Sequence, residues 1–93
     1  MQVHHHPHDQ GGALVLMDGE RRVGELTYYV RDDLRVIDHT WVDPSLRGKG
    51  VAGSLMEAVV SLARTQGWKL SATCSYAVWS FDKHPEFGDV CAP

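Results

Sequence analysis

The stretch from residue 51 to residue 63 constrains the fold most, because its apolar residues recur with helical spacing between two strand-like segments. Spacings of three and four residues predict a helix with one broad apolar face, and Gly67 ends it. That face carries Val51, Ala52, Leu55, Met56, Val59, Val60 and Ala63. Residues 34–42 before it are rich in β-branched and aromatic residues, and residues 69–75 after it alternate. A strand–helix–strand crossover of this length predicts that the two strands are parallel neighbours.

Two further strands are predicted before residue 34. Residues 13–17 form a short apolar run, and residues 21–30 alternate roughly between apolar and polar. Asp18-Gly19 between them is a strong signal for a two-residue hairpin in which both central residues have positive φ. Together with residues 34–42, these segments predict an antiparallel meander.

The two ends of the chain differ in character. Residues 76–84 predict a short second helix that stops before Pro85. The predicted order is therefore β-β-β-α-β-α, an α+β fold that makes residues 13–93 one small domain. Residues 1–12 hold four histidines within five positions, interrupted by Pro7, and we expect a flexible tail without a functional metal site.

Charge and composition exclude several classes of partner. The net charge is −3, from 9 basic and 12 acidic residues, and the basic ones are scattered, which argues against nucleic-acid binding. No apolar run approaches the roughly 18 residues of a membrane span, and no signal-peptide pattern is present, so we expect a cytoplasmic protein. In that compartment Cys74 and Cys91 are expected to be free thiols. An exposed edge strand allows a weak homodimer beside the monomer.

The segment between the third strand and the helix contains Gly48-x-Gly50-x-x-Gly53. A dinucleotide site would need these glycines directly after the first strand of a βαβ unit and an acidic residue about twenty positions later, and neither is present. A P-loop would need a glycine at the position of Asp43. What remains is the N-terminus of a helix, whose free amides bind anions, with the charge of Lys49 beside it. The alternative is a turn that only starts the helix.

The fragment VDPSLRGKGVAGSLM resembles the acetyl-CoA-binding segment of the GNAT acetyltransferase superfamily. The Arg/Gln-x-x-Gly-x-Gly/Ala pattern of that family falls here on Arg47, Gly50 and Ala52. The resemblance implies that the loop amides hold the pyrophosphate of coenzyme A, and that the strand ending at Trp41 and Val42 pairs with its pantetheine arm. It also implies an oxyanion donor among the backbone amides near Val42. The cofactor-binding loop would comprise Arg47, Gly48, Lys49, Gly50, Val51 and Ala52.

Residues 39–87 are more specifically similar to a small single-domain GNAT-like subfamily, which predicts a truncated GNAT-like fold. That subfamily lacks the helices with which larger members bind the acceptor. By this resemblance Cys74 is a candidate acyl-accepting nucleophile, although a lone cysteine on a strand is more often core. His39 is the candidate general base, against a purely structural role, and Ser75 and Tyr76 are candidates for the edge of the cofactor site.

The resemblance implies a protein that binds acetyl-CoA and transfers the acetyl group to an amine or protein acceptor, with Cys74 as a potential intermediate carrier. Two alternatives remain open from the sequence. One is a non-catalytic acyl-CoA-binding or sensing module, and the other is a partner-binding subunit that retains the loop only as structure. Tyr76, Trp79 and Phe81 are expected to be core residues of the short helix.

Overall fold

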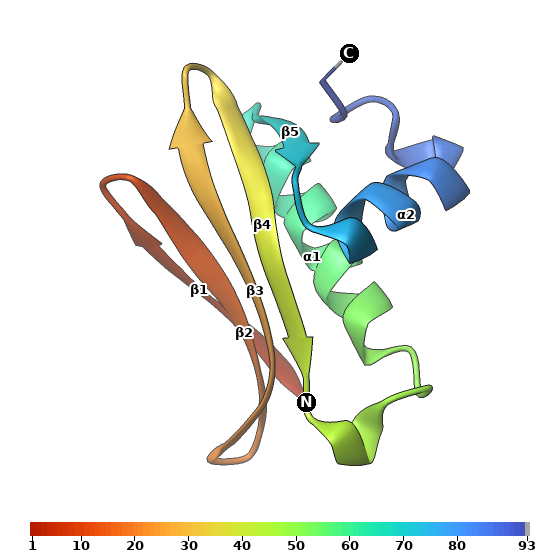
Figure 1. The fold of residues 1–93 in the computed structure, drawn as a ribbon. Helices are drawn as coiled ribbons and strands as arrows, with labels where there is room; N and C mark the ends of the chain where they lie inside the picture. Colours follow the sequence, from red (N-terminus) through yellow and green to blue (C-terminus); the bar gives the residue numbers. More distant parts are fainter. Residues whose placement is uncertain (93) are drawn as a thin grey trace.

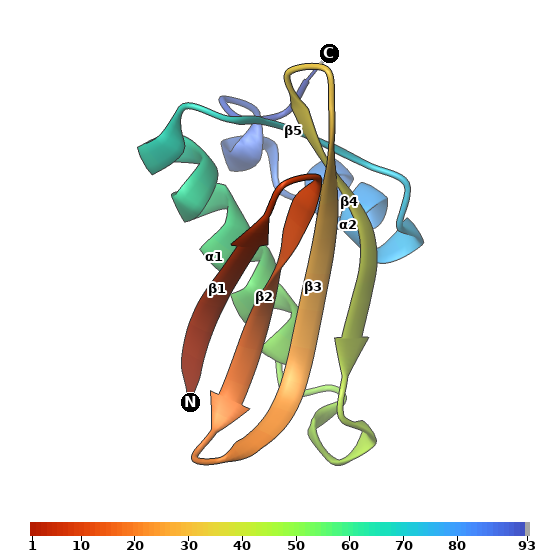
Figure 2. The same cartoon turned by 90° about the vertical axis from the view of Figure 1, so that its left-hand side faces the viewer.

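The computed structural model describes residues 1–92 and contains one mixed five-stranded sheet with two helices packed on one of its faces (Figures 1 and 2). The strands lie side by side in sequence order. They are β1 (Gln2–His8), β2 (Gly11–Asp18), β3 (Arg21–Arg31), β4 (Leu34–Val42) and β5 (Lys69–Ala72). β1 to β4 are antiparallel, and β5 pairs parallel to β4. The predicted α+β order is confirmed from residue 11 onward.

Helix α1 (Val51–Gln66) makes the crossover from β4 to β5, and the shorter α2 (Ser75–Lys83) follows β5. Two short 3₁₀ helices, Pro44–Leu46 and Pro85–Phe87, precede α1 and follow α2. α1 ends at Gly67, which has φ 74° and donates its amide hydrogen to the Ala63 carbonyl, as predicted from the sequence.

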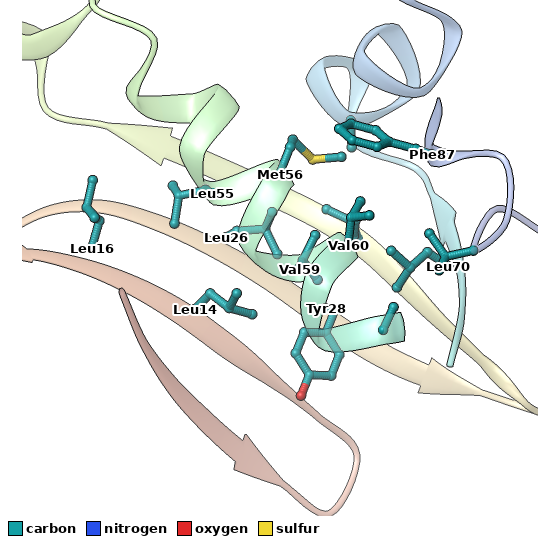
Figure 3. Close-up of a cluster of buried hydrophobic side chains, with 14 of the residues drawn as sticks. Leu14, Leu16, Leu26, Tyr28, Leu55, Met56, Val59, Val60, Leu70 and Phe87 are labelled. Atoms are coloured by element: carbon teal, nitrogen blue, oxygen red, sulfur yellow. The ribbon is translucent and has the colours of Figure 1, made fainter. Parts of the chain in front are cut away.

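The core lies between α1 and the sheet (Figure 3). It contains the apolar helix face predicted from spacing except Ala52, which is half-buried. Leu55, Val59 and Ala63 have no exposed surface. They form one core cluster with residues of β2 to β5 and of the Pro85–Phe87 helix, namely Leu14, Leu16, Leu26, Tyr28, Ile37, Leu70 and Phe87. Because burial of apolar area is the main favourable term in folding, this single interface stabilises most of the domain.

The N-terminal segment differs from the prediction. Gln2–His8 do not form an irregular tail but strand β1, which pairs antiparallel with β2 along its whole length. His5 points to the helix face, where its Nε2 lies 2.6 Å from the Tyr28 hydroxyl and its ring contacts Trp68 edge-on. A histidine-rich segment has no strand-like apolar pattern, so the open edge of β2 and this aromatic contact, rather than local preference, account for β1.

Two local predictions also need correction. The hairpin between β2 and β3 turns at Gly19-Glu20, one residue later than predicted, and of these only Gly19 has positive φ. The strand predicted over residues 69–75 ends at Ala72, and α2 begins at Ser75. Cys74 is therefore the residue that caps the start of α2 rather than a strand residue.

A candidate cofactor pocket at the divergence of two strands

The site begins where β4 and β5 separate. Their parallel pairing runs from Leu34 and Lys69 to Ile37 and Ala72 and then stops, although β4 continues to Val42. The Ile37 carbonyl closes the pairing by accepting hydrogen bonds from the amides of both Thr73 (3.0 Å) and Cys74 (3.2 Å). Residues 38–42 consequently have no β5 partner within the described chain.

A bulge in β4 changes which side chains face the helices. His39 pairs with Thr27 and Ile37 with Tyr28, so Asp38 is an extra residue that has no partner on β3. The Thr27 hydroxyl donates to the Asp38 carboxylate at 2.6 Å, which places Asp38 on the same face as Thr27 and His39. Strict alternation along the strand would place Asp38 and His39 on opposite faces, and the bulge brings them to the same face.

Beyond the bulge, Thr40 returns to the helix face, because it pairs with the fully buried Leu26. Its hydroxyl oxygen lies 3.5 Å from the sulfur of Cys74. His39 lies on the other face of the sheet and is exposed, so the structure does not bring it to Cys74. The neighbour of the thiol is Thr40, which sequence reasoning missed because the bulge cannot be read from alternation.

Cys74 lies half-buried at the N-terminal end of α2. Burial raises the pKa of its thiol. Hydrogen bonds from the Thr40 hydroxyl and from the nearby amides of Ala77, Tyr76 and Thr40 lower it by more, so the net pKa is below the usual thiol value. Cys91 shows the opposite behaviour, because burial and the Asp89 carboxylate raise its pKa. The two free thiols therefore differ in their readiness to form a thiolate.

The loop that leaves β4 is held by Asp43. Its carboxylate accepts hydrogen bonds from the amide and hydroxyl of Ser45 and from the Arg21 guanidinium, which lies 2.8 Å away. The Ser45 hydrogen bonds, together with Arg21, lower the pKa of Asp43 to about 2. The carboxylate thus ties the start of the glycine loop to the first residue of β3.

The glycine loop leaves the start of α1 open. Gly50 has φ 75° and precedes the helix, and no side chain caps the first turn, which also contains no acidic residue. The first intrahelical hydrogen bond is donated by Ser54 to the Gly50 carbonyl, so the amides of Val51, Ala52 and Gly53 have no intrahelical acceptor. These amides and the positive end of the helix dipole favour an anion here. Neither Arg47 nor Lys49 forms an ion pair within residues 1–92.

A pocket of about 280 Å³ lies between this loop and α2. It is lined by Val42, Leu46, Arg47, Gly48, Gly50, Val51, Ala52, Gly53, Tyr76 and Trp79. Six of the predicted cofactor residues are in this set, namely Val42, Arg47, Gly48, Gly50, Val51 and Ala52. Trp41, Lys49 and Ser75 are not in the lining. Trp41 pairs with Glu25, and its side chain therefore lies on the sheet face that carries His39.

Sequence reasoning missed three residues of the lining or assigned them elsewhere, whereas Tyr76 was a candidate for its edge. Trp79 was expected in the core but is 51% exposed and forms part of the pocket wall with Tyr76. Gly53 was noted only as the last glycine of the loop pattern, yet it lines the pocket, and a Cβ there would meet no other atom within 4 Å. Leu46 belongs to the short 3₁₀ helix and had no periodic signal. Helical spacing alone cannot distinguish Trp79 from a core residue.

Within residues 1–92, no three His, Cys, Asp or Glu side chains gather in a way that would hold a metal ion. None of the helices in the same range has the length and apolar character needed to cross a membrane.

Comparison with known proteins agrees with this geometry. Residues 13–90 match the GCN5-related N-acetyltransferase family. A search of curated sequences found no significant match. Among solved structures, the chain is 32% identical to a GCN5-like protein from Staphylococcus aureus whose N-acetyltransferase assignment is itself provisional. That alignment covers 96% of this chain and 87% of the other, with a TM-score of 0.73.

Larger enzymes share the fold at lower identity. A ribosomal-protein-alanine N-acetyltransferase from Brucella melitensis biovar Abortus 2308 is 22% identical, with a TM-score of 0.63, over 90% of this chain and 65% of that enzyme. An aminoglycoside N-acetyltransferase solved with CoA is 20% identical, with a TM-score of 0.60, over 87% of this chain and 60% of that enzyme. The chain therefore spans less than two thirds of the length of these enzymes.

Proposed function

The chain belongs to the GCN5-related N-acetyltransferase family, and on that premise we propose that it binds acetyl-CoA in the pocket between the glycine loop and α2 and transfers the acetyl group to an amine. The observation that carries this proposal is the uncapped start of α1, which opens into the pocket. The unpaired part of β4 runs between this pocket and Thr40, whose hydroxyl contacts the Cys74 thiol. The amine can belong to a small molecule or to a protein.

Binding of the co-substrate would use both ends of the pocket. The amides of Val51, Ala52 and Gly53 donate to the pyrophosphate, and Arg47 adds charge from the pocket lining. Beyond the loop, the edge of β4 that β5 has left offers backbone groups near Val42 to the amide-containing pantetheine arm. Trp41 contributes through its backbone alone, because its side chain is on the other face.

Acetyl transfer through Cys74 would take two balanced steps. The Cys74 thiolate attacks the thioester carbonyl carbon, the bond from that carbon to the CoA sulfur breaks, and the departing CoA thiolate takes up the proton that Cys74 gave up. The amine nitrogen then attacks the acetyl carbon, the bond to the Cys74 sulfur breaks, and the thiol regains a proton from the amine. The Thr40 hydroxyl and the α2 amides stabilise the thiolate at the start and at the end of this sequence.

A non-catalytic acyl-CoA-binding module is the second candidate, and one observation favours it. The pocket lining contains no Asp, Glu or His side chain, and His39 lies on the opposite face of the sheet. A transferase of this shape would therefore need an acceptor that is already deprotonated, or a base that the acceptor brings with it.

The binding proposal is tested by titrating the protein with CoA and following the backbone amides of residues 47–53 by NMR. We expect these amides to shift, and Arg47→Ala to weaken binding about tenfold in a salt-dependent manner, because a phosphate contact is lost. Arg31→Ala, at the exposed end of β3, is the matched control and should bind as the wild type does. Unshifted amides at millimolar CoA would refute the proposal.

Intact-mass analysis after incubation with acetyl-CoA tests the chemistry. The chain has two free cysteines of similar burial, so Cys91→Ala is the natural control for Cys74→Ala. An acetyl adduct that persists in Cys91→Ala and disappears in Cys74→Ala would support the two-step route. CoA release with an amine but without an adduct would support direct transfer. If neither an adduct nor CoA release is observed, the result favours the binding module.

A further inference from the structure

Three exposed histidines of β1 project from the sheet face that no helix covers. Side chains alternate along the strand, so His4, His6 and His8 share one face. His5 points the other way, toward the core, and contacts the Tyr28 hydroxyl. Figure 2 shows the uncovered face toward the viewer, with the helices behind the sheet. The expectation of no metal site at these histidines depends on a flexible segment, and the segment is a strand instead.

The rings of His4 and His6 already lie next to each other. Their centroids are 6.4 Å apart and their planes are inclined by only 28°. Two ring nitrogens bound to one tetrahedral Zn²⁺ lie about 3.3 Å apart, because each Zn–N bond is about 2.0 Å long. Rotation of the two exposed side chains between rotamers closes that difference without moving the strand. The pair is therefore suited to chelate one Zn²⁺.

A single chain does not complete this site. Zn²⁺ in a structural site takes four ligands, and within residues 1–92 no third His, Cys, Asp or Glu side chain joins the pair. On the neighbouring strand β2, His4 is opposite Val15 and His6 is opposite Ala13, and neither of these apolar side chains binds a metal. Two further ligands must come from water or from another molecule.

The outer edge of β1 is open to another molecule. β1 is the first strand of the sheet, and its edge away from β2 has no partner strand in the described part of the chain. Such an edge can pair with the same edge of a second copy. If the two strands pair antiparallel with His5 opposite His5, then His4 of each copy lies opposite His6 of the other. Opposite side chains share a face and have Cβ atoms about 5 Å apart, so four imidazoles meet.

The helix face of β1 leaves room for such a pairing. α1 packs mainly on β2 to β5, and a hollow lined by Val3, His5, Ala58 and Leu62, among others, separates it from β1. Val3 is 38% exposed there. Pro7 has no amide hydrogen to donate, and proline in an edge strand disfavours pairing through the backbone alone. Association through β1 therefore needs a further attraction, which a shared metal ion supplies.

We infer that His4 and His6 of two copies bind one Zn²⁺ between them, and that this ion joins the two chains edge to edge through β1. Imidazole is a preferred ligand of Zn²⁺, and four ring nitrogens supply the tetrahedral set of a closed structural site. The second copy contributes half of the ligands, so the site exists only in the dimer. It lies on β1, whereas the candidate cofactor pocket lies beside the glycine loop and α2, and it does not depend on the proposed function.

Sedimentation velocity and calorimetric titration of the untagged full chain with zinc chloride test this inference. We expect a monomer in EDTA and a dimer with Zn²⁺, with one ion bound per two chains. His4→Asn and His6→Asn should each abolish the dimer and weaken Zn²⁺ binding about tenfold or more, since even the groups behind metal ligands are worth that much. His8→Asn is the matched control. His8 is on the same strand face but lies opposite Gln2 of the second copy, so this variant should behave as the wild type does.

Co²⁺ gives a direct readout of the ligand set. Four-coordinate Co²⁺ absorbs visible light much more strongly than the hydrated octahedral ion, and thiolate charge-transfer bands would report Cys74 or Cys91 as a ligand. We expect the strong visible absorption without the thiolate bands. Thermal melting in EDTA should be unchanged in all three histidine variants, because the substituted side chains are exposed.

Several outcomes would overturn the inference. The wild type would do so by binding no Zn²⁺, by binding one ion per chain as a monomer, or by forming the same dimer in EDTA. Zn²⁺ binding that persists in the His4→Asn and His6→Asn variants would place the ion elsewhere. Loss of the dimer in His8→Asn as complete as in His4→Asn would contradict the pairing about His5.

Discussion

The hydroxyl oxygen of Thr40 lies 3.5 Å from the sulfur of Cys74, across the gap that opens where β5 ends. The two residues are far apart in the chain and come from different elements, a bulged strand and the start of a helix. Neither residue lines the pocket, but each is two positions from a residue that does, Val42 and Tyr76. The first prediction concerns the strength of this contact.

Thr40→Val should make the Cys74 thiol less acidic, because it removes a hydrogen bond that lowers the pKa of this group. The pH at which Cys74 reacts half-maximally with iodoacetamide should rise. At neutral pH the reaction should slow about two- to tenfold, the equivalent of one hydrogen bond. Thr40→Ser keeps the hydroxyl and should restore the wild-type profile. All measurements use the Cys91→Ala background, and an unchanged profile in Thr40→Val would show that the contact has no effect on the thiol.

Two glycines at the start of α1 have different roles: Gly50 is needed for its backbone conformation, and Gly53 for the space it leaves in the pocket. Gly50→Ala places a side chain at φ 75°, where L-residues are strained by roughly 1–2 kcal/mol, and should lower the free energy of unfolding by about that amount. Gly53 is helical and has open space around it, so Gly53→Ala should be neutral or stabilising by up to about 1 kcal/mol.

For Gly53→Ala, we expect the affinity for CoA and the stability of the fold to change differently. The new methyl group of Gly53→Ala lies in the pocket lining and should hinder the approach of the phosphate, so affinity should fall although stability does not. A Gly53→Ala variant that binds CoA like the wild type would place the phosphate elsewhere.

The lowered pKa of Asp43 predicts that the stability of the fold depends on pH in the acidic range. Its folded pKa of about 2 lies below the ordinary aspartate value of 3.8, so its carboxylate stabilises the fold above pH 3.8, and that contribution is lost as the pH falls toward 2. Asp43→Asn should therefore melt at a lower temperature than the wild type at neutral pH, and the difference should close in acid. Asp33→Asn, in the turn after β3, is the control, and a gap that persists near pH 2 would contradict the assignment.

The lowered pKa of His5 predicts a second pH effect, on the stability of strand β1. Burial, and to a smaller extent His6, lower the pKa of His5 below 6.5, so the folded chain favours the neutral ring against Tyr28. Stability is then complete above pH 6.5 and decreases as the pH falls from 6.5 toward the lower folded value. Hydrogen exchange of the β1 amides should speed up over that interval after correction for the intrinsic pH dependence.

His5→Gln should remove that pH dependence, because the replacement does not titrate. His4→Gln is the matched control, since His4 pairs with Val15 and its ring lies on the other face of β1. Equal protection of β1 above and below pH 6.5 in the wild type would contradict the prediction.

Much of the fold followed from local patterns. The spacing of Leu55, Met56 and Val59 placed α1, and the β-branched run of residues 34–42 placed β4 with the correct bounds. Parallel pairing of β4 and β5 followed from the length of the crossover. In each case one element's own sequence, or the distance between two elements, carries the information.

The misplaced features depend on contacts between distant residues. β1 forms because β2 offers an open edge and because Tyr28 and Trp68 receive His5, and none of this is visible in a run of histidines. β5 ends at Ala72 because the Ile37 carbonyl takes the amides of Thr73 and Cys74 and turns the chain into α2. The bulge at Asp38 then decides which residue of β4 faces the thiol.

The sequence by itself determined the helix, the order of the later strands and the glycine loop, because hydrophobic periodicity and glycine placement are properties of short segments. Only the tertiary structure decided that Thr40 rather than His39 lies beside Cys74, and that Trp79 lines the pocket instead of the core. A side chain's face and neighbours depend on strand register and helix packing, which are set by the whole chain at once.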